Sequence, residues 1–308
     1  QDDIKAANEQ VAALKKALPN SAIARLYEAQ MAYLGGDNKL ARQLIQQLLK
    51  VAPGNLRALY IAGAVELKLN NSLQAIAHLN KALSLAPDLM DARLLLARTH
   101  LRAAQPAQAL KTLSPALELP SPSLEALTLA AEAHLQIGDP VNSEVYFKRA
   151  LKLKPDDARS RTALALASLA KGDDTGFKEL EAIAKTDDSS LADMALINSR
   201  LQRGQFDAAL EDIAALEKKL VDKPLPAYLR GRLLLLREDL PGARKSFEQA
   251  LSKDAAFFPA VNSLALLDLM EKRPEASQKR LESLLKTNPG NTEAMMSIAD
   301  LRVTQGAS

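Results

Sequence analysis

The sequence predicts an all-α chain in which one pair of helices is repeated along its whole length. Three observations support this prediction. Apolar residues recur at the i, i+3, i+4 and i+7 spacing of helices, and no segment carries a comparable strand signal. Helix-ending prolines recur at multiples of 34 residues, at Pro19, Pro53, Pro87 and Pro155. Small residues recur where the two helices of a pair must approach each other closely.

Residues 56–89 form the clearest copy of the repeated unit. One face of its first helix carries Leu59, Ala62 and Gly63, and one face of its second helix carries Ala75, Leu79 and Ala82. Asn70-Asn71-Ser72 supplies turn-forming residues between them, and Pro87 cannot continue the second helix. A helix pair of this length cannot bury both apolar faces alone, so it needs copies of itself on either side.

The same pattern divides the remaining chain, which we expect to form one continuous domain, residues 1–308. The predicted bounds are 1–21 (a half unit), 22–55, 56–89, 90–123, 124–157, 158–189, 190–223, 224–257, 258–291 and 292–308 (a half unit). The unit 158–189 fits worst, because Phe177 stands where a small residue is expected and Glu181 where an apolar one is expected. Gly204 follows Gly172 by only 32 residues, so we expect a local irregularity here.

Composition excludes several classes of protein. The formal net charge is +3, from 40 basic and 37 acidic residues, which is too balanced for a nucleic-acid-binding surface. The absence of cysteine excludes disulfides, thiolate metal sites and a cysteine nucleophile. No apolar run approaches the roughly 18 residues that a membrane-spanning helix needs.

The 34-residue pattern resembles tetratricopeptide repeats over essentially the whole chain. The resemblance implies a right-handed α-solenoid of about eight helix-turn-helix units, with a half unit at each end. Missing tryptophan and scarce tyrosine in the first helices are departures from the family pattern.

Three stretches, 48–71, 96–118 and 254–277, resemble more narrowly the large repeat lipoproteins of the PEP-CTERM and exosortase system. Those proteins accompany exopolysaccharide biosynthesis loci in Gram-negative bacteria. The resemblance implies a periplasmic or outer-membrane location, a scaffolding role, and a lipid anchor that lies outside this chain. A cytoplasmic location is the alternative.

The residues that could carry chemistry do not form a recognisable active site. His78, His100 and His134 are the only histidines, and His100 and His134 occupy the same place in adjacent units. We interpret His100 and His134 as packing residues with a satisfied polar tip rather than as metal ligands, and we expect His78 to lie on a second helix, away from both. The glycine-rich turns at 35–37 and 172–176 match no phosphate or calcium motif. We therefore predict no catalytic, cofactor-binding or metal-binding residues.

The remaining candidate is the inner surface formed by the first helices, where ligands of repeat proteins usually bind. By analogy with the family, Leu26 and Gln30 point inward. The predicted partner-binding residues are Tyr60, Arg98, Glu132, Asn198, Tyr228, Arg232 and Asn262. The alternative is a solvated inner wall without a ligand.

The sequence therefore predicts a non-enzymatic scaffold for protein or peptide partners, placed by resemblance in an envelope exopolysaccharide or PEP-CTERM protein export system. One alternative is a cytosolic adaptor for chaperones or pilus assembly. Another is a module that binds the polysaccharide directly, although a chain without tryptophan offers few aromatic platforms for sugar rings.

Overall fold

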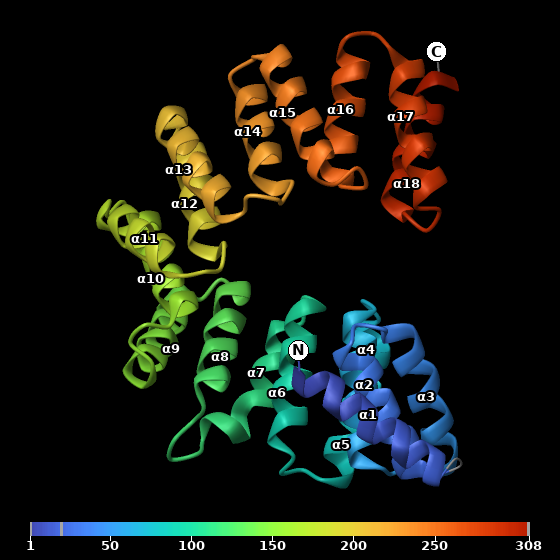
Figure 1. The fold of residues 1–308 in the computed structure, drawn as a ribbon. Helices are drawn as coiled ribbons and strands as arrows, with labels where there is room; N and C mark the ends of the chain where they lie inside the picture. The colour runs from blue at the N-terminus through green and yellow to red at the C-terminus, as the bar shows by residue number, and fades with distance from the viewer. Residues whose placement is uncertain (1, 19–20, 307–308) are drawn as a thin grey trace. The chain divides into compact units, whose positions relative to one another are not determined.

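The computed structural model describes residues 2–18 and 21–306, and these residues form eighteen α-helices and no β-strand (Figure 1). The all-α prediction is therefore confirmed for the described part of the chain. Pro19, the predicted end of the first half unit, lies outside the described residues. The chain divides into two compact units, residues 1–160 and 161–308, and each is described by itself.

In the first unit, short turns join helices that pack in pairs. The first helices of the pairs are α2 (Ala22–Leu34), α4 (Leu56–Lys68), α6 (Met90–Arg102) and α8 (Leu124–Ile137). The second helices are α1 (Asp2–Ala17), α3 (Asn38–Val51), α5 (Ser72–Leu85), α7 (Pro106–Leu117) and α9 (Pro140–Leu153). The helices α2, α4, α6 and α8 contact one another in succession, and we call their outer surface the first-helix face.

The second unit continues the same alternation. Helix α10 (Ala158–Ala170) contains the boundary between the units. The later first helices are α12 (Leu191–Gln202), α14 (Leu225–Leu236), α16 (Phe258–Met270) and α18 (Thr292–Gly306). The second helices are α11 (Thr175–Thr186), α13 (Phe206–Lys219), α15 (Leu240–Lys253) and α17 (Pro274–Thr287). Each predicted repeat between residues 22 and 291 thus holds one pair of helices.

The two helices of a pair meet at a small residue on the first helix. A Cβ atom added to Gly63 would lie 2.5 Å from Cγ of Leu79, which is fully buried. A Cβ atom on Gly231 would lie 2.5 Å from the Phe247 ring in the same way. The small residues predicted from the 34-residue pattern therefore mark the actual helix crossings.

The turn inside each pair depends on a residue with positive φ. Counting from the first residue of each repeat, this residue is always at position 15. The eight residues are Gly36, Asn70, Ala104, Gly138, Gly172, Gly204, Glu238 and Lys272. Ala104, with φ 53°, has a side chain that disfavours this left-handed conformation.

The expected irregularity in the repeat 158–189 is present, but the predicted register of its second helix was wrong by one residue. Gly176, not Phe177, takes the small place, because a Cβ atom on Gly176 would collide with the carbonyl oxygen of Ala165. Leu180, which is fully buried, takes the apolar place that had been assigned to Glu181. Glu181 instead accepts a hydrogen bond from a partly buried arginine of α12.

The register changes because the two missing residues are divided around α11. The small residue Gly176 follows Ser143 by 33 residues and precedes Ala209 by 33, instead of 34 in each case. One residue is therefore lost before Gly176 and one after it.

In several repeats position 11 carries a polar residue that is buried or partly buried. Glu66 accepts hydrogen bonds from Arg42 (2.8 Å), on the preceding second helix, and from Asn71 (2.8 Å). His100 and His134 fill the same position, and their Nδ1 atoms lie 2.8 Å from Gln105 and 3.1 Å from Asp139. The interpretation of these two histidines as packing residues with a satisfied polar tip is confirmed.

In the repeat 190–223, position 11 is Arg200, which faces Asp212 on the second helix. Its Nε lies 2.6 Å from Asp212 Oδ2, but the two atoms are not aligned for a hydrogen bond. Burial of the Asp212 carboxyl raises its pKa to about 6. The positive charge of Arg200 acts in the opposite direction but is the smaller effect.

We predict opposite consequences for two glycine-to-alanine substitutions in the first unit. Gly63→Ala places a methyl group against Leu79 and should lower the free energy of unfolding by about 1 to 3 kcal/mol. Gly54→Ala meets only an ordinary contact at 3.7 Å and should change it by less than about 0.5 kcal/mol. Urea denaturation of the two variants tests this, and equal losses would contradict the assigned crossing.

A second pair of substitutions tests the turn. Ala104→Gly should stabilise the first unit by roughly 0.5 to 1 kcal/mol, because glycine adopts positive φ without strain. Ala77→Gly, at an exposed site inside α5, should destabilise it by about 1 kcal/mol. Thermal melting should give shifts of opposite sign, and a shared sign would show that the turn is not strained.

The raised pKa of Asp212 predicts a pH effect on stability. The unfolded carboxyl ionises near its usual value, so the folded state binds more protons between pH 4 and 6, and its stability falls as pH rises through this range. Asp212→Asn should therefore gain about 1 kcal/mol over wild type between pH 4.5 and 7.5, after allowance for screening by solvent. Denaturation midpoints at the two pH values measure this, and a pH-independent difference would contradict it.

Candidate functional site

The first-helix face of the first unit brings three of the predicted binding residues together. Tyr60, Arg98 and Glu132 belong to α4, α6 and α8, and the charge of Arg98 acts on both Tyr60 and Glu132. Burial and the nearby carboxylate of Asp91 raise the pKa of Tyr60, so the phenol stays protonated. The three side chains therefore form one row across successive helices.

Polar pairs link three neighbouring pairs of first helices, α2 with α4, α6 with α8, and α8 with α10. Arg98 donates to Glu125 at 2.6 Å, and Glu132 pairs with Arg159. Gln30, which was expected to point inward, accepts a hydrogen bond from Arg57 at 2.5 Å. These pairs join residues that are 27 positions apart.

Glu132 is the least solvated member of the row. Burial raises the pKa of its carboxyl, and the charges of Arg159 and Arg98 oppose this effect. Leu26, the other residue expected to point inward, is instead 8% exposed and packs in the core with Ala29 and Ile61. It therefore offers no side chain to a partner.

In the second unit, Tyr228 and Arg232 lie together on α14, as the sequence predicted. The Arg232 guanidinium lies 5.9 Å from the centre of the Tyr228 ring. Tyr228 also packs edge-on against Phe257, at 5.5 Å between ring centres, and near Phe247 at 5.8 Å. Its ring is thus held by the core, while Arg232 is exposed.

The two predicted asparagines differ in setting. Asn198 is exposed on α12. Asn262, on α16, accepts a hydrogen bond from Ser297 at 3.3 Å and lines a hollow of about 310 Å³ between α16 and α18. Leu269 and Leu301 supply apolar walls to this hollow.

The sequence analysis missed the residues that pair with the predicted ones. Arg57, Glu125 and Arg159 all stand at position 2 of their repeats, as does Asp91, whose charge acts on Tyr60 without a direct pair. Complementary residues spaced 27 apart, one repeat less two helical turns, were the signal that could have revealed them. Arg98 and Glu132 are therefore paired with charged residues of the next repeat rather than free.

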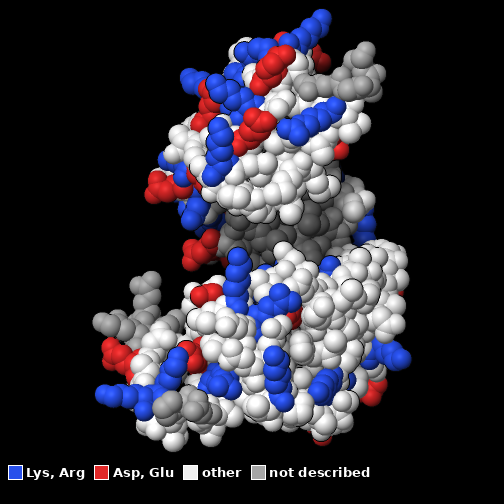
Figure 2. Space-filling view, turned by 90° about the vertical axis from the view of Figure 1, so that its right-hand side faces the viewer, with Lys and Arg blue, Asp and Glu red and all other residues white. Residues whose placement is uncertain are grey.

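Several other kinds of site receive no support in the described part of the chain. Its residues include no group of three His, Asp or Glu side chains that could hold a metal ion. None of its helices is both long and apolar enough to cross a bilayer. On the face drawn in Figure 2, Lys and Arg side chains are interspersed with Asp and Glu.

Family models match several segments of the chain. Models described as tetratricopeptide repeat match residues 35–89, 194–257 and 124–157. A model described as subunit 3 of the anaphase-promoting complex, or cyclosome, matches residues 74–140. No curated protein matches the sequence.

Solved structures resemble the fold at low sequence identity. A tetratricopeptide repeat protein from Parabacteroides merdae is 17% identical, with a TM-score of 0.62, over 76% of this chain and 93% of that one. Yeast Tom70 is 15% identical, with a TM-score of 0.69, over 92% of this chain and 64% of that one. Human IFIT1, solved as a dimer with m7Gppp-AAAA, is 17% identical, with a TM-score of 0.61, over 97% and 77%. The repeated helix pairs, the family models and these likenesses agree that the chain is a tetratricopeptide-repeat protein.

Proposed function

We propose that this chain is a non-enzymatic scaffold that holds protein or peptide partners on the first-helix faces of its units. We also propose that it serves an envelope exopolysaccharide or PEP-CTERM protein export system, in the periplasm or at the outer membrane. Tetratricopeptide repeats generally indicate protein–protein interaction, which supports the first part of the proposal.

The row formed by Tyr60, Arg98 and Glu132 is the observation that carries the binding role. Tyrosine and arginine are the residue types enriched at binding hot spots. The pair between Arg98 and Glu125 is about half exposed on both sides, so it contributes little to stability. A carboxylate of a partner can therefore replace Glu125 beside Arg98 at small cost to the fold.

The envelope role is supported by the resemblance of stretches 48–71, 96–118 and 254–277 to the PEP-CTERM-associated repeat lipoproteins. Attachment to a membrane would then come from a lipid anchor outside this chain. Direct binding of the polysaccharide has weaker support, because the chain has no tryptophan and only five tyrosines to stack on sugar rings.

Substitutions on the first-helix face test the binding role. The immobilised chain is incubated with an envelope extract of the cells that produce it, and captured proteins are quantified by mass spectrometry. We expect Arg98→Glu, or Tyr228→Ala combined with Arg232→Ala, to reduce capture of specific partners about tenfold or more, since these are hot-spot residue types.

Lys245→Ala is the matched control, because Lys245 is exposed on a second helix. It should leave capture unchanged. Partners that bind every first-helix variant as tightly as wild type would remove the proposed surface. Capture of cytosolic chaperones alone, with the chain itself in the cytosolic fraction, would contradict the envelope role.

A further inference from the structure

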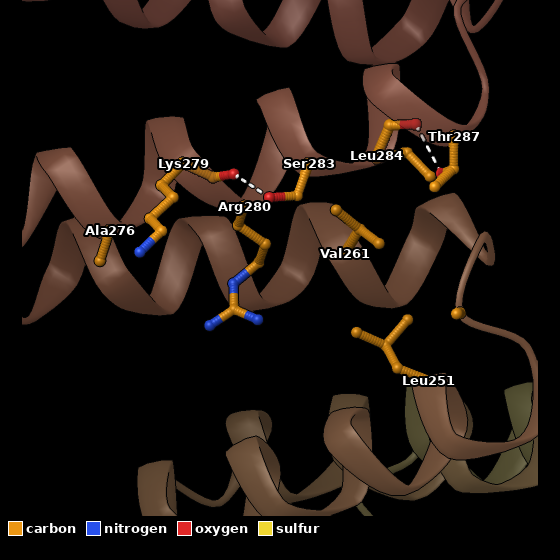
Figure 3. A pocket seen from close by; sticks show the side chains of 9 residues that line it. Leu251, Val261, Ala276, Lys279, Arg280, Ser283, Leu284 and Thr287 are labelled. Atoms are coloured by element: carbon orange, nitrogen blue, oxygen red, sulfur yellow. Dashed lines mark hydrogen bonds between the residues drawn. The ribbon is translucent and has the colours of Figure 1, made fainter.

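A groove opens beside two second helices of the second unit, and none of its lining residues belongs to the candidate surface just described. It lies between α15 and α17, over the first turn of α16 (Figure 3). Its volume is about 510 Å³, which is within the usual range for ligand pockets. The lining residues are Leu251, Ala255, Val261, Ala276, Lys279, Arg280, Ser283, Leu284 and Thr287.

The groove lies where this repeat carries shorter side chains than the repeat 56–89 does. Ser283 and Thr287 correspond to Lys81 and Leu85 in the repeat 56–89. In that repeat the Leu85 side chain reaches back toward Gly54, at the end of the preceding repeat. Thr287 is shorter, so the same space next to α15 stays open.

The floor of the groove is apolar despite its two hydroxyl groups. The Ser283 hydroxyl donates to the carbonyl of Lys279 at 2.8 Å, and the Thr287 hydroxyl donates to the carbonyl of Leu284 at 2.9 Å (Figure 3). Both hydroxyls are thus satisfied by their own helix. Leu251 and Val261 complete an apolar floor that suits an aliphatic side chain.

One end of the groove is positively charged. Lys279 is exposed, and its ammonium group has no partner among the described residues. The Arg280 side chain extends from α17 toward the gap in Figure 3, and its Nε donates to Asp268 at 3.1 Å.

The carboxylate of Asp268 cannot neutralise this end, because it is shared. Asp268 also accepts hydrogen bonds from Arg244 at 2.8 Å and from Arg273 at 3.1 Å. Glu271 pairs with the same two arginines. Three arginines therefore share two carboxylates, and Lys279 adds a further positive charge.

We propose that this groove is a second binding site, which takes a peptide segment carrying a carboxylate side chain next to a leucine-sized aliphatic one. The aliphatic group lies on Leu251, Val261 and Leu284, and the carboxylate pairs with Lys279 and Arg280. The residues of this site are not those of the first-helix face, so the site adds a second class of partner to the one proposed above.

The test is selection of a random phage-displayed peptide library on the immobilised full chain, followed by fluorescence polarisation with the enriched peptides. We expect the enriched sequences to combine Asp or Glu with an adjacent Leu, Ile, Val or Met. Their binding should weaken as salt is raised, because the pairing charges are exposed.

Two variants locate the site. Thr287→Leu introduces the leucine that Leu85, Leu119 and Leu153 provide in earlier repeats, so it fills the groove with a residue this fold already accepts. Lys279→Glu reverses the unpaired charge. We expect each to weaken binding at least tenfold while the thermal midpoint falls by no more than a few degrees.

Lys245→Glu is the matched control, because Lys245 holds the same repeat position as Lys279 one repeat earlier and is also exposed. It should leave binding unchanged. The proposal is overturned if the library yields no acidic and aliphatic peptide, if the enriched peptides bind Thr287→Leu as well as wild type, or if Lys245→Glu weakens binding equally. Loss of binding in Arg98→Glu would instead place the peptides on the first-helix face.

Discussion

The contact between a small residue on one helix and a large apolar side chain on the next is the constraint on which this structure depends. Gly63 against Leu79 and Gly231 against Phe247 leave no room for even a methyl group. This closeness sets the spacing of the pair, and the spacing decides which other positions are buried. Because each pair still has an apolar face to cover, the contact must be repeated along the chain. The low aromatic content follows, since alanine and leucine suit such closely packed helices better than tryptophan.

The residue at position 11, next to this contact, differs from repeat to repeat. The interactions between neighbouring helices therefore differ as well. Where it is acidic, as at Glu66 and Asp268, the preceding second helix supplies an arginine, Arg42 or Arg244. Where it is His134, the imidazole stacks on Tyr146 at 5.4 Å between ring centres. Buried charges of this kind add little net stability, because desolvation offsets their attraction. What differs between these interfaces is which partner satisfies the buried polar group.

The helix pairs and their crossings could be predicted from the sequence, because prolines, turn glycines and small residues all repeat with one period. The row of Tyr60, Arg98 and Glu132 followed from the same period. The register of α11 could not be predicted. The distance between turn glycines shows that the repeat is two residues short, but it does not show that one residue is lost before Gly176 and one after it. The charges facing Arg98 and Glu132 come from the next repeat, and only their 27-residue spacing in the sequence signals them. The groove beside Thr287 was also missed, since its signal is the absence of a long side chain.

The ion pairs at position 11 also affect whether the protein tolerates the deletion of a whole repeat. Recombination between repeats readily deletes whole copies, and identical hairpins would tolerate such a loss. Removal of residues 224–257 would bring Asp268 against Leu210 in place of Arg244. The joined protein would then bury a carboxylate that has lost one of its three arginine partners. Selection against misfolded products would therefore act on the order of the repeats, and not only on their number.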